Sequence, residues 1–358
     1  MVRIGTERPH YERAAARLAA PLLGMLLLLA AAAVTAAELW YEDNNLGRHG
    51  QMPADFASKF QQPEAFSQAS RYIHVYMFHA RVLERQDDAF LRDTLIPWLE
   101  KHSVKLAIDA VGATWTQDRA RVKVRGREIH LLERIKKLGG RVDYISLQSV
   151  LSKPLRRDGK VQDYSLDKRI EDVIAYAKAA REVFPSAEIG IIDALPSHGK
   201  DYRQPYRRLR DAMAREGLAL AYIHLDMPFE YPAERINGVS WRSARAVERY
   251  VEEDLGLQFG LLATSKTGGT LSSRAFHEKV MAALECYMGI TGTPRDLVIA
   301  SWFPHPRSTI PETATGDDYP AMRTVLEFGR SLERIRNAGP AWAKHRSREP
   351  EWRALCTM

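Results

Sequence analysis

Three aspartates each follow directly after an apolar run that is long enough to form a buried strand. Asp109 ends the segment "LAID", Asp193 ends "GIID" and Asp226 ends "IHLD". Carboxylates that meet in an apolar setting repel one another, so the pKa of at least one of them rises. One carboxyl group can then stay protonated as a general acid while another is ionised. The three residues suggest acid–base catalysis, although an aspartate after a strand can instead cap a helix or a turn.

Aromatic and polar residues near these segments suggest a sugar-binding site. Aromatic faces pack on the C–H faces of sugar rings, while carboxylates, amides and imidazoles bond hydroxyl groups. The predicted binding residues are Trp115, Gln148, His224, Glu230, Trp302, His305 and Glu312. The alternatives are core packing for the aromatics, a solvent-exposed turn for His305 and a barrel-rim contact for Gln148. The glycine-rich "TSKTGGT" (264–270) is expected to be a mobile loop that could form a lid.

Seven apolar segments alternate with amphipathic ones, as strand–helix units do. They cover residues 72–78, 104–110, 142–148, 188–194, 220–226, 258–264 and 297–303, and Ser165 and Ser240 are expected to cap the helices that follow two of them. Continuous apolar strands of this kind indicate a parallel sheet that is buried on both faces. No GxGxxG or GxxxxGK[ST] follows a strand, so the pattern favours a closed (β/α)8 TIM-type barrel of the α/β class. The eighth strand stays open: it is residues 38–43, or the barrel is irregular.

The N-terminal segment differs from the rest of the chain. Four arginines precede an apolar run over residues 18–37 that ends in "VTAAE". This arrangement predicts a secretory signal peptide over residues 1–37, and an uncleaved membrane anchor is the alternative. Residues 38–358 would then form one barrel domain with a C-terminal helical tail. We therefore expect a periplasmic or secreted protein with no membrane contact beyond the signal peptide.

The charge, the cysteines and the missing motifs limit the partners and cofactors that we expect. The formal charge is +7, and removing residues 1–37 leaves +5, which is mild and spread over several helices. A nucleic-acid partner is therefore not expected. Cys286 and Cys356 could form a disulfide in an oxidising compartment, or stay as two buried thiols. The histidines form no HExxH pattern and no GxSxG is present, so we predict no metal and no cofactor.

The strand ends "LAID", "GIIDALP" and "YIHLDMPF", with "SWFPHPRSTIPET" after the last strand, resemble those of bacterial exported TIM-barrel proteins of the glycoside hydrolase superfamily. The resemblance covers nearly all of residues 38–340. It implies a glycosidase-like activity. The large retaining families in this superfamily carry a catalytic glutamate after the fourth strand, commonly as Asn-Glu, and another on the seventh. Counted from the sequence alone, the fourth strand ends in Ile192-Asp193 and the seventh in Ser301-Trp302.

Three functional hypotheses follow. The first is a glycoside hydrolase that acts on a polysaccharide or oligosaccharide, with Asp193 as general acid, Asp226 as its partner and Asp109 tuning their charge. Carboxyl groups about 5 Å apart would predict retention of configuration, and about 6.5–9.5 Å would predict inversion. The second is a barrel that binds an extracellular or cell-surface glycan without cleaving it. The third is a metal-assisted hydrolase that uses Asp109, Asp226 and His224.

Overall fold

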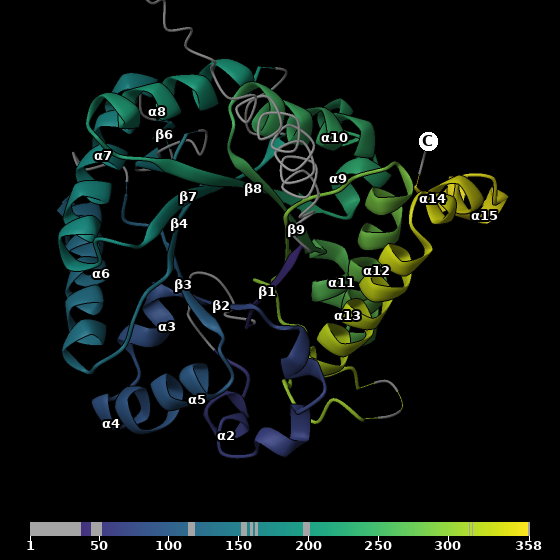
Figure 1. Ribbon diagram of the computed structural model, residues 1–358, viewed down its shortest axis with the longest axis horizontal. Coiled ribbons are helices and arrows are strands. Elements are labelled where there is room, and N and C mark those ends of the chain that lie inside the picture. The colour runs from purple at the N-terminus through teal and green to yellow at the C-terminus, as the bar shows by residue number, and fades with distance from the viewer. Residues whose placement is uncertain are drawn as a thin grey trace, which may run out of the picture. The chain divides into compact units, whose positions relative to one another are not determined.

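Eight parallel strands form a closed barrel in the computed structural model of the chain (Figure 1). The barrel strands are β1 (Glu38–Glu42), β2 (Val75–His79), β3 (Lys105–Ala110), β4 (Tyr144–Gln148), β7 (Glu188–Asp193), β8 (Leu220–Pro228), β9 (Gln258–Thr264) and β10 (Asp296–Ile299). Their order is β1-β10-β9-β8-β7-β4-β3-β2, so β1 pairs with both β2 and β10. The predicted fold is confirmed, and β1 is the eighth strand that the sequence left open.

The structure describes residues 37–43, 52–113, 119–151, 156–157, 160–161, 164–195, 201–314, 316 and 318–356. Residues 37–358 belong to one compact unit. The predicted signal peptide, apart from Ala37, lies outside the described residues, and so does Trp115. A two-stranded antiparallel sheet, β5 (Arg156–Arg157) and β6 (Lys160–Val161), stands apart from the barrel sheet.

Helices surround the barrel (Figure 1). The α-helices are α2 (Phe56–Lys59), α3 (Ala80–Glu84), α4 (Asp88–Phe90), α5 (Ile96–Lys101), α6 (Arg119–Lys137), α7 (Leu166–Val183), α8 (Arg203–Arg215), α9 (Glu230–Ala233), α10 (Trp241–Arg249), α11 (Lys266–Leu271), α12 (Ser273–Gly289), α13 (Ala321–Ala338), α14 (Pro340–Arg346) and α15 (Pro350–Cys356). Shorter 3-10 or π turns are η2 (Pro63–Phe66), η3 (Ala69–Tyr72), η4 (Leu91–Leu95), η6 (Ile236–Gly238) and η7 (Tyr250–Asp254). Within the described part of the chain, no helix has the length and apolar character needed to cross a bilayer.

Serine caps start two of the long helices where the sequence predicted them. The Ser165 side chain accepts a hydrogen bond from the backbone N–H of Lys168 at the start of α7. Ser240 and Ser243 form a reciprocal capping box at the start of α10. These bonds satisfy backbone donors that a helix leaves unpaired in its first turn. The connections that lead into α7 and α10 therefore end at a defined residue.

Large aromatic side chains fill the barrel interior. The rings of Trp40 and Tyr144 lie 4.7 Å apart between centroids, and the hydroxyl of Tyr222 hydrogen-bonds Ser146 Oγ at 2.9 Å. Gly190 provides the space for Tyr222, because a Cβ at that position would lie 2.2 Å from the tyrosine ring. The interior is therefore a packed core, and chemistry has to take place at one end of the barrel.

Most of the segment "TSKTGGT" is helical, because α11 begins at Lys266, so the prediction of a mobile loop that could form a lid is wrong. Ser265 caps α11, and Glu230 accepts bonds from the Ser265 hydroxyl at 2.5 Å and from the first two backbone N–H groups of α11. Gly268 and Gly269 are buried, and a Cβ on Gly269 would lie 2.8 Å from Phe303. The glycines allow close packing in this helix and do not indicate a flexible loop.

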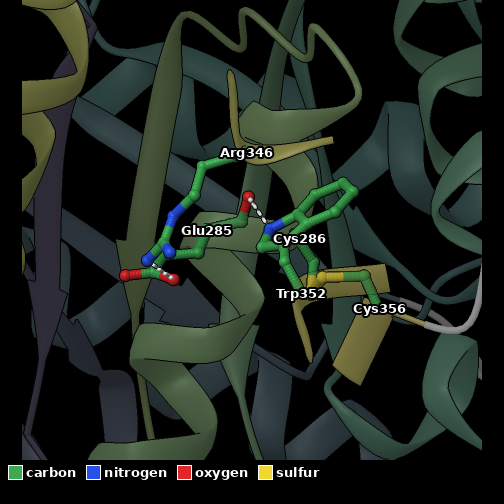
Figure 2. The surroundings of a disulfide bond; sticks show 5 residues. All are labelled: Glu285, Cys286, Arg346, Trp352 and Cys356. Carbon is green, nitrogen blue, oxygen red and sulfur yellow. Dashed lines mark hydrogen bonds and ion pairs between the residues drawn. A yellow bond between two sulfur atoms is a disulfide. The ribbon is translucent and has the colours of Figure 1, made fainter. Parts of the chain in front are cut away.

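The C-terminal helices are tied to α12 by a disulfide between Cys286 and Cys356 (Figure 2). Beside it, the indole N–H of Trp352 donates to the backbone carbonyl of Glu285 at 3.4 Å. The guanidinium of Arg346 lies 2.9 Å from the Glu285 carboxylate. The sequence allowed either a disulfide or two thiols, and the structure has the disulfide at the end of the predicted helical tail.

Candidate active site

Polar side chains line the carboxyl end of the barrel, where active sites of this fold lie. Strand pairing shows which way they point: Asp226 is paired with Leu262, and Glu42 with Met77, and both partners belong to the interior core. Two-residue alternation along the strands gives the other inward positions. The inward residues at this end, which we call the mouth residues, are Glu42, His79, Asp109, Gln148, Asp226, Thr264 and Trp302.

Asp226 combines an inward orientation with a raised pKa. Its Oδ1 is buried and accepts no hydrogen bond from the residues that the structure describes. Burial, and after it the charge of Asp193, raises the pKa of Asp226 from 3.8 to about 7. A carboxyl group with this pKa is protonated in a large fraction of molecules at neutral pH, as a general acid must be.

Asp193 lies on the outer face of β7, away from the barrel interior. It is paired with Leu225, which belongs to the core between the barrel and the helices. Burial and the Asp193 carboxylate raise the pKa of Tyr206 on α8, and the same carboxylate lies near Arg169 on α7. This orientation does not suit the general-acid role that the sequence suggested. It suits an electrostatic role, in which the charge of Asp193 acts on Asp226.

Asp109, Gln148 and Trp302 lie at the mouth, as the sequence suggested. Asp109 is fully buried and is aligned with His79 and Ser146 on the neighbouring strands. Gln148 is partly exposed at the end of β4. The Trp302 ring packs against the interior core, and its buried Nε1 has no partner among the described residues. These three side chains and Asp226 come from four different segments and share one end of the barrel.

Three mouth residues were not predicted: Glu42, His79 and Thr264. Each stands at the end of an apolar run, which is the signal that identified the aspartates. Burial, and after it the charge of Arg81, lowers the pKa of His79 to about 4, so the imidazole is neutral at pH 7. Its Nδ1 accepts a hydrogen bond from the backbone N–H of Arg81 at 3.2 Å, which leaves Nε2 to carry the ring proton.

His305 and Glu312 anchor the loop after β10 to the scaffold. The backbone N–H of His305 donates to the Gly269 carbonyl at 2.9 Å, and its Nδ1 lies 3.1 Å from Ser273 Oγ. The buried Glu312 carboxylate accepts backbone N–H groups at the start of η3, at 3.1 and 2.6 Å. Glu230 is likewise engaged by the N-terminus of α11. These contacts give the three residues structural roles that their sequence positions did not reveal.

His224 lies inside the barrel rather than at the mouth. Its Nε2 is 3.1 Å from the carboxylate of Asp296, the first residue of β10, and its ring contacts Trp40 and Tyr222. Among the residues that the structure describes, no three or more His, Cys, Asp or Glu side chains are grouped closely enough to hold a metal ion. The set Asp109, Asp226 and His224 is therefore not assembled as a metal site.

The presence of β1 shifts the strand count by one, which corrects the comparison with the retaining families. The fourth barrel strand is β4, which ends in Gln148, and the seventh is β9, which ends in Thr264. Asp193 ends the fifth strand, and Trp302 follows the eighth. Neither the fourth nor the seventh strand therefore ends in a carboxylate.

No protein-family model matches this sequence, and no curated protein is similar to it in sequence. Solved structures are similar in fold. The structure of a fungal β-1,4-galactanase is 11% identical, with a TM-score of 0.52 over 82% of this chain and 100% of that one. A Croceicoccus marinus glucosidase is 13% identical, with a TM-score of 0.46 over 75% of this chain and 63% of that one. This chain thus spans less than two thirds of the glucosidase.

A D-psicose 3-epimerase from Clostridium cellulolyticum H10 is 14% identical, with a TM-score of 0.47 over 84% of this chain and 98% of that one. At these identities the likeness establishes the architecture alone. The chain therefore shares the TIM-type barrel fold with the fungal galactanase, and its function has to be argued from its own mouth residues.

Proposed function

We propose that this protein is a glycoside hydrolase that acts on a polysaccharide or oligosaccharide outside the cytoplasm. The observation that carries the proposal is Asp226, an inward carboxyl group at the barrel mouth whose pKa is raised to about 7. Glycosidic bond cleavage needs a carboxylic acid that is still protonated near neutral pH. The fold that this chain shares with the fungal galactanase supports the substrate class, and the N-terminal apolar segment supports export.

Asp226 is the general acid that protonates the leaving glycosidic oxygen, and Asp109 is the second carboxylate. Asp226 is on β8 and Asp109 is on β3. Two strands, β7 and β4, separate them on one side of the barrel and four strands separate them on the other, so the two side chains reach the mouth from different sides. Inversion of configuration would require the two carboxyl groups to lie about 6.5–9.5 Å apart, which leaves room for a water molecule between them. Trp302 offers a ring against which a sugar can pack, and Gln148 offers an amide for its hydroxyl groups.

The test is release of reducing ends from a panel of polysaccharides by the wild-type protein and by Asp226→Asn, Asp109→Asn and Asp193→Asn. Both mouth variants should lose at least a hundredfold in rate. Asp193→Asn should stay active. In its pH–rate profile, the fall in activity at high pH should begin at a lower pH than in wild type, because removing the nearby charge lowers the pKa of Asp226. Equal loss in Asp193→Asn and Asp226→Asn would contradict this division of roles between the two aspartates.

A non-catalytic glycan-binding barrel is the second candidate, and the ends of β4 and β9 favour it. Gln148 and Thr264 occupy the strand ends where the retaining families carry their glutamates. On this hypothesis the wild-type protein binds a polysaccharide and releases no product. Asp226→Asn would then bind with unchanged affinity, so one set of proteins separates the two functions.

A further inference from the structure

A cleft of about 540 Å³ lies on the outer surface of the molecule, between α12, α13 and α14. Its walls include Trp342 and Arg346 from α14, Ser331 and Arg334 from α13, and Glu285 from α12. None of the mouth residues lines it. The volume falls in the range of small-molecule sites, about 300–1,000 Å³, so the cleft can accept one or two sugar rings.

The charges around the cleft leave one cation available. Arg346 lies between two carboxylates, 2.9 Å from Glu285 and 2.5 Å from Glu349. Glu349 also lies 3.1 Å from His345. Arg334 is exposed, donates to Ser331 Oγ at 2.8 Å, and forms no ion pair with any residue in the described ranges. The two acids are thus engaged, and the guanidinium of Arg334 can take an anion.

Trp342 supplies an aromatic surface in the same cleft. It is half-buried and packs against the outer core, so part of its ring stays accessible. A surface of this kind packs on the C–H face of a sugar ring, while a guanidinium binds a carboxylate through two parallel hydrogen bonds. A sugar that carries a carboxylate uses both groups at once.

The tail that forms one wall of the cleft is held firmly. The disulfide between Cys286 and Cys356 joins α15 to α12 (Figure 2). Trp352 packs so closely on α12 that a Cβ at Gly289 would lie 2.1 Å from its ring. Arg346 joins α14 to Glu285 of α12 in the same view. Few groups must be ordered when a ligand enters, which favours binding.

We propose that this cleft, between α12, α13 and α14, is a second carbohydrate site that binds an acidic sugar unit, with Trp342 packing on the ring and Arg334 pairing with the carboxylate. The proposal does not depend on hydrolysis at the barrel mouth. It assigns the protein a way to hold an acidic polysaccharide at a surface separate from the mouth residues.

The experiment is calorimetric titration of the full folded protein with tetragalacturonate, a uronate oligosaccharide, and with galactotetraose, its neutral counterpart. The wild-type protein should bind the uronate at least tenfold more tightly, and raising the salt concentration should reduce the difference. Arg334→Gln should lose at least tenfold in uronate affinity, and Trp342→Ala should lose as much for both sugars. Trp342→Phe should retain most of the affinity because it keeps a ring.

Two control variants locate the binding. Arg330 lies one helical turn before Arg334 on α13 and donates a hydrogen bond to the Gln68 side chain at 2.7 Å. Arg330→Gln removes this cation and should bind the uronate like wild type. Glu333→Gln changes an exposed residue of α13 that does not line the cleft and should also retain the uronate affinity. The calorimetric signal reports binding alone, so the result can be interpreted even if the hydrolysis proposal fails. No uronate binding by the wild-type protein, or binding that Arg334→Gln leaves unchanged, would overturn the proposal. Arg334 is exposed, so its variant folds even if Trp342→Ala does not.

Discussion

At the residue scale, the protonation of Asp226 links the candidate chemistry to stability. Its pKa rises from 3.8 in the unfolded chain to about 7 in the folded protein. Between these pH values the unfolded chain releases the proton and the folded protein keeps it. The free energy of unfolding therefore falls as the pH rises through this window, and the full loss is present above pH 7. Keeping a carboxyl group at this position thus costs stability at neutral pH, which suits a group that is needed for chemistry.

We predict that Asp226→Asn becomes more stable than wild type as the pH rises. The amide cannot ionise, so between pH 5 and pH 8 the gain over wild type should grow by about 2–3 kcal/mol. Denaturant titrations at both pH values measure it, with Asp211→Asn, an exposed aspartate bonded to Arg210, as the matched control. A gain that is equal at the two pH values would show that the Asp226 proton is not held as described.

The sequence located the three aspartates at one end of the barrel but not their orientation. β7 is apolar on both faces, because one face meets the barrel interior and the other meets the helices. Its two-residue alternation therefore carries no polar signal, and Asp193 and Asp226 look alike in the sequence. Only the pairing of Asp193 with Leu225 shows which of them points outward.

At the element scale, the loop after β10 depends on Glu312. We predict that Glu312→Ala lowers the free energy of unfolding by about 2–4 kcal/mol, because two backbone N–H groups at the start of η3 lose a charged acceptor. Glu312→Gln keeps one acceptor oxygen and should lose less. Thermal and denaturant unfolding measure both. Glu333→Ala, which removes an exposed hydrogen bond from Tyr72, should stay within about 1 kcal/mol of wild type.

A binding role for Glu312 would give a different result. The glutamine variant would then lose affinity for the substrate without losing stability. Local sequence could not separate these roles, because a buried cap and a substrate ligand are both carboxylates in a proline-rich loop. The same limit explains α11: its glycines indicate a loop by propensity, whereas contacts with Glu230 and Phe303 from other parts of the chain make it helical.

At the scale of the whole molecule, the disulfide joins residues that are 70 positions apart. We predict that replacing Cys286 and Cys356 by serine together destabilises the protein by about 4 kcal/mol or less, through the freedom that the unfolded chain regains. Denaturant unfolding of the double variant against wild type measures the loss, and the far-UV circular dichroism of the folded protein should be unchanged. A change in that spectrum would mean that the tail also supports the barrel helices.

The architecture was the most predictable property of the chain. Seven strand–helix repeats produce a pattern that many residues share, so single deviations do not hide it. β1 escaped a firm assignment because no typical strand–helix repeat surrounds it, although it is as long as β2 and β4. The sequence left the state of the two cysteines undecided for another reason. A disulfide forms only if α15 packs beside α12, and the presence of two cysteines does not determine where α15 packs.

The closing position of β1 also affects the order of events in biosynthesis. This strand emerges from the ribosome before any other barrel strand, yet one of its two neighbours, β10, begins 258 residues later in the chain, at Asp296. A contact of such long range is costly in chain entropy until the intervening strands are in place. The nascent protein therefore keeps two unpaired edges of the barrel sheet until β10 has been made, and a chaperone has that interval in which to bind them.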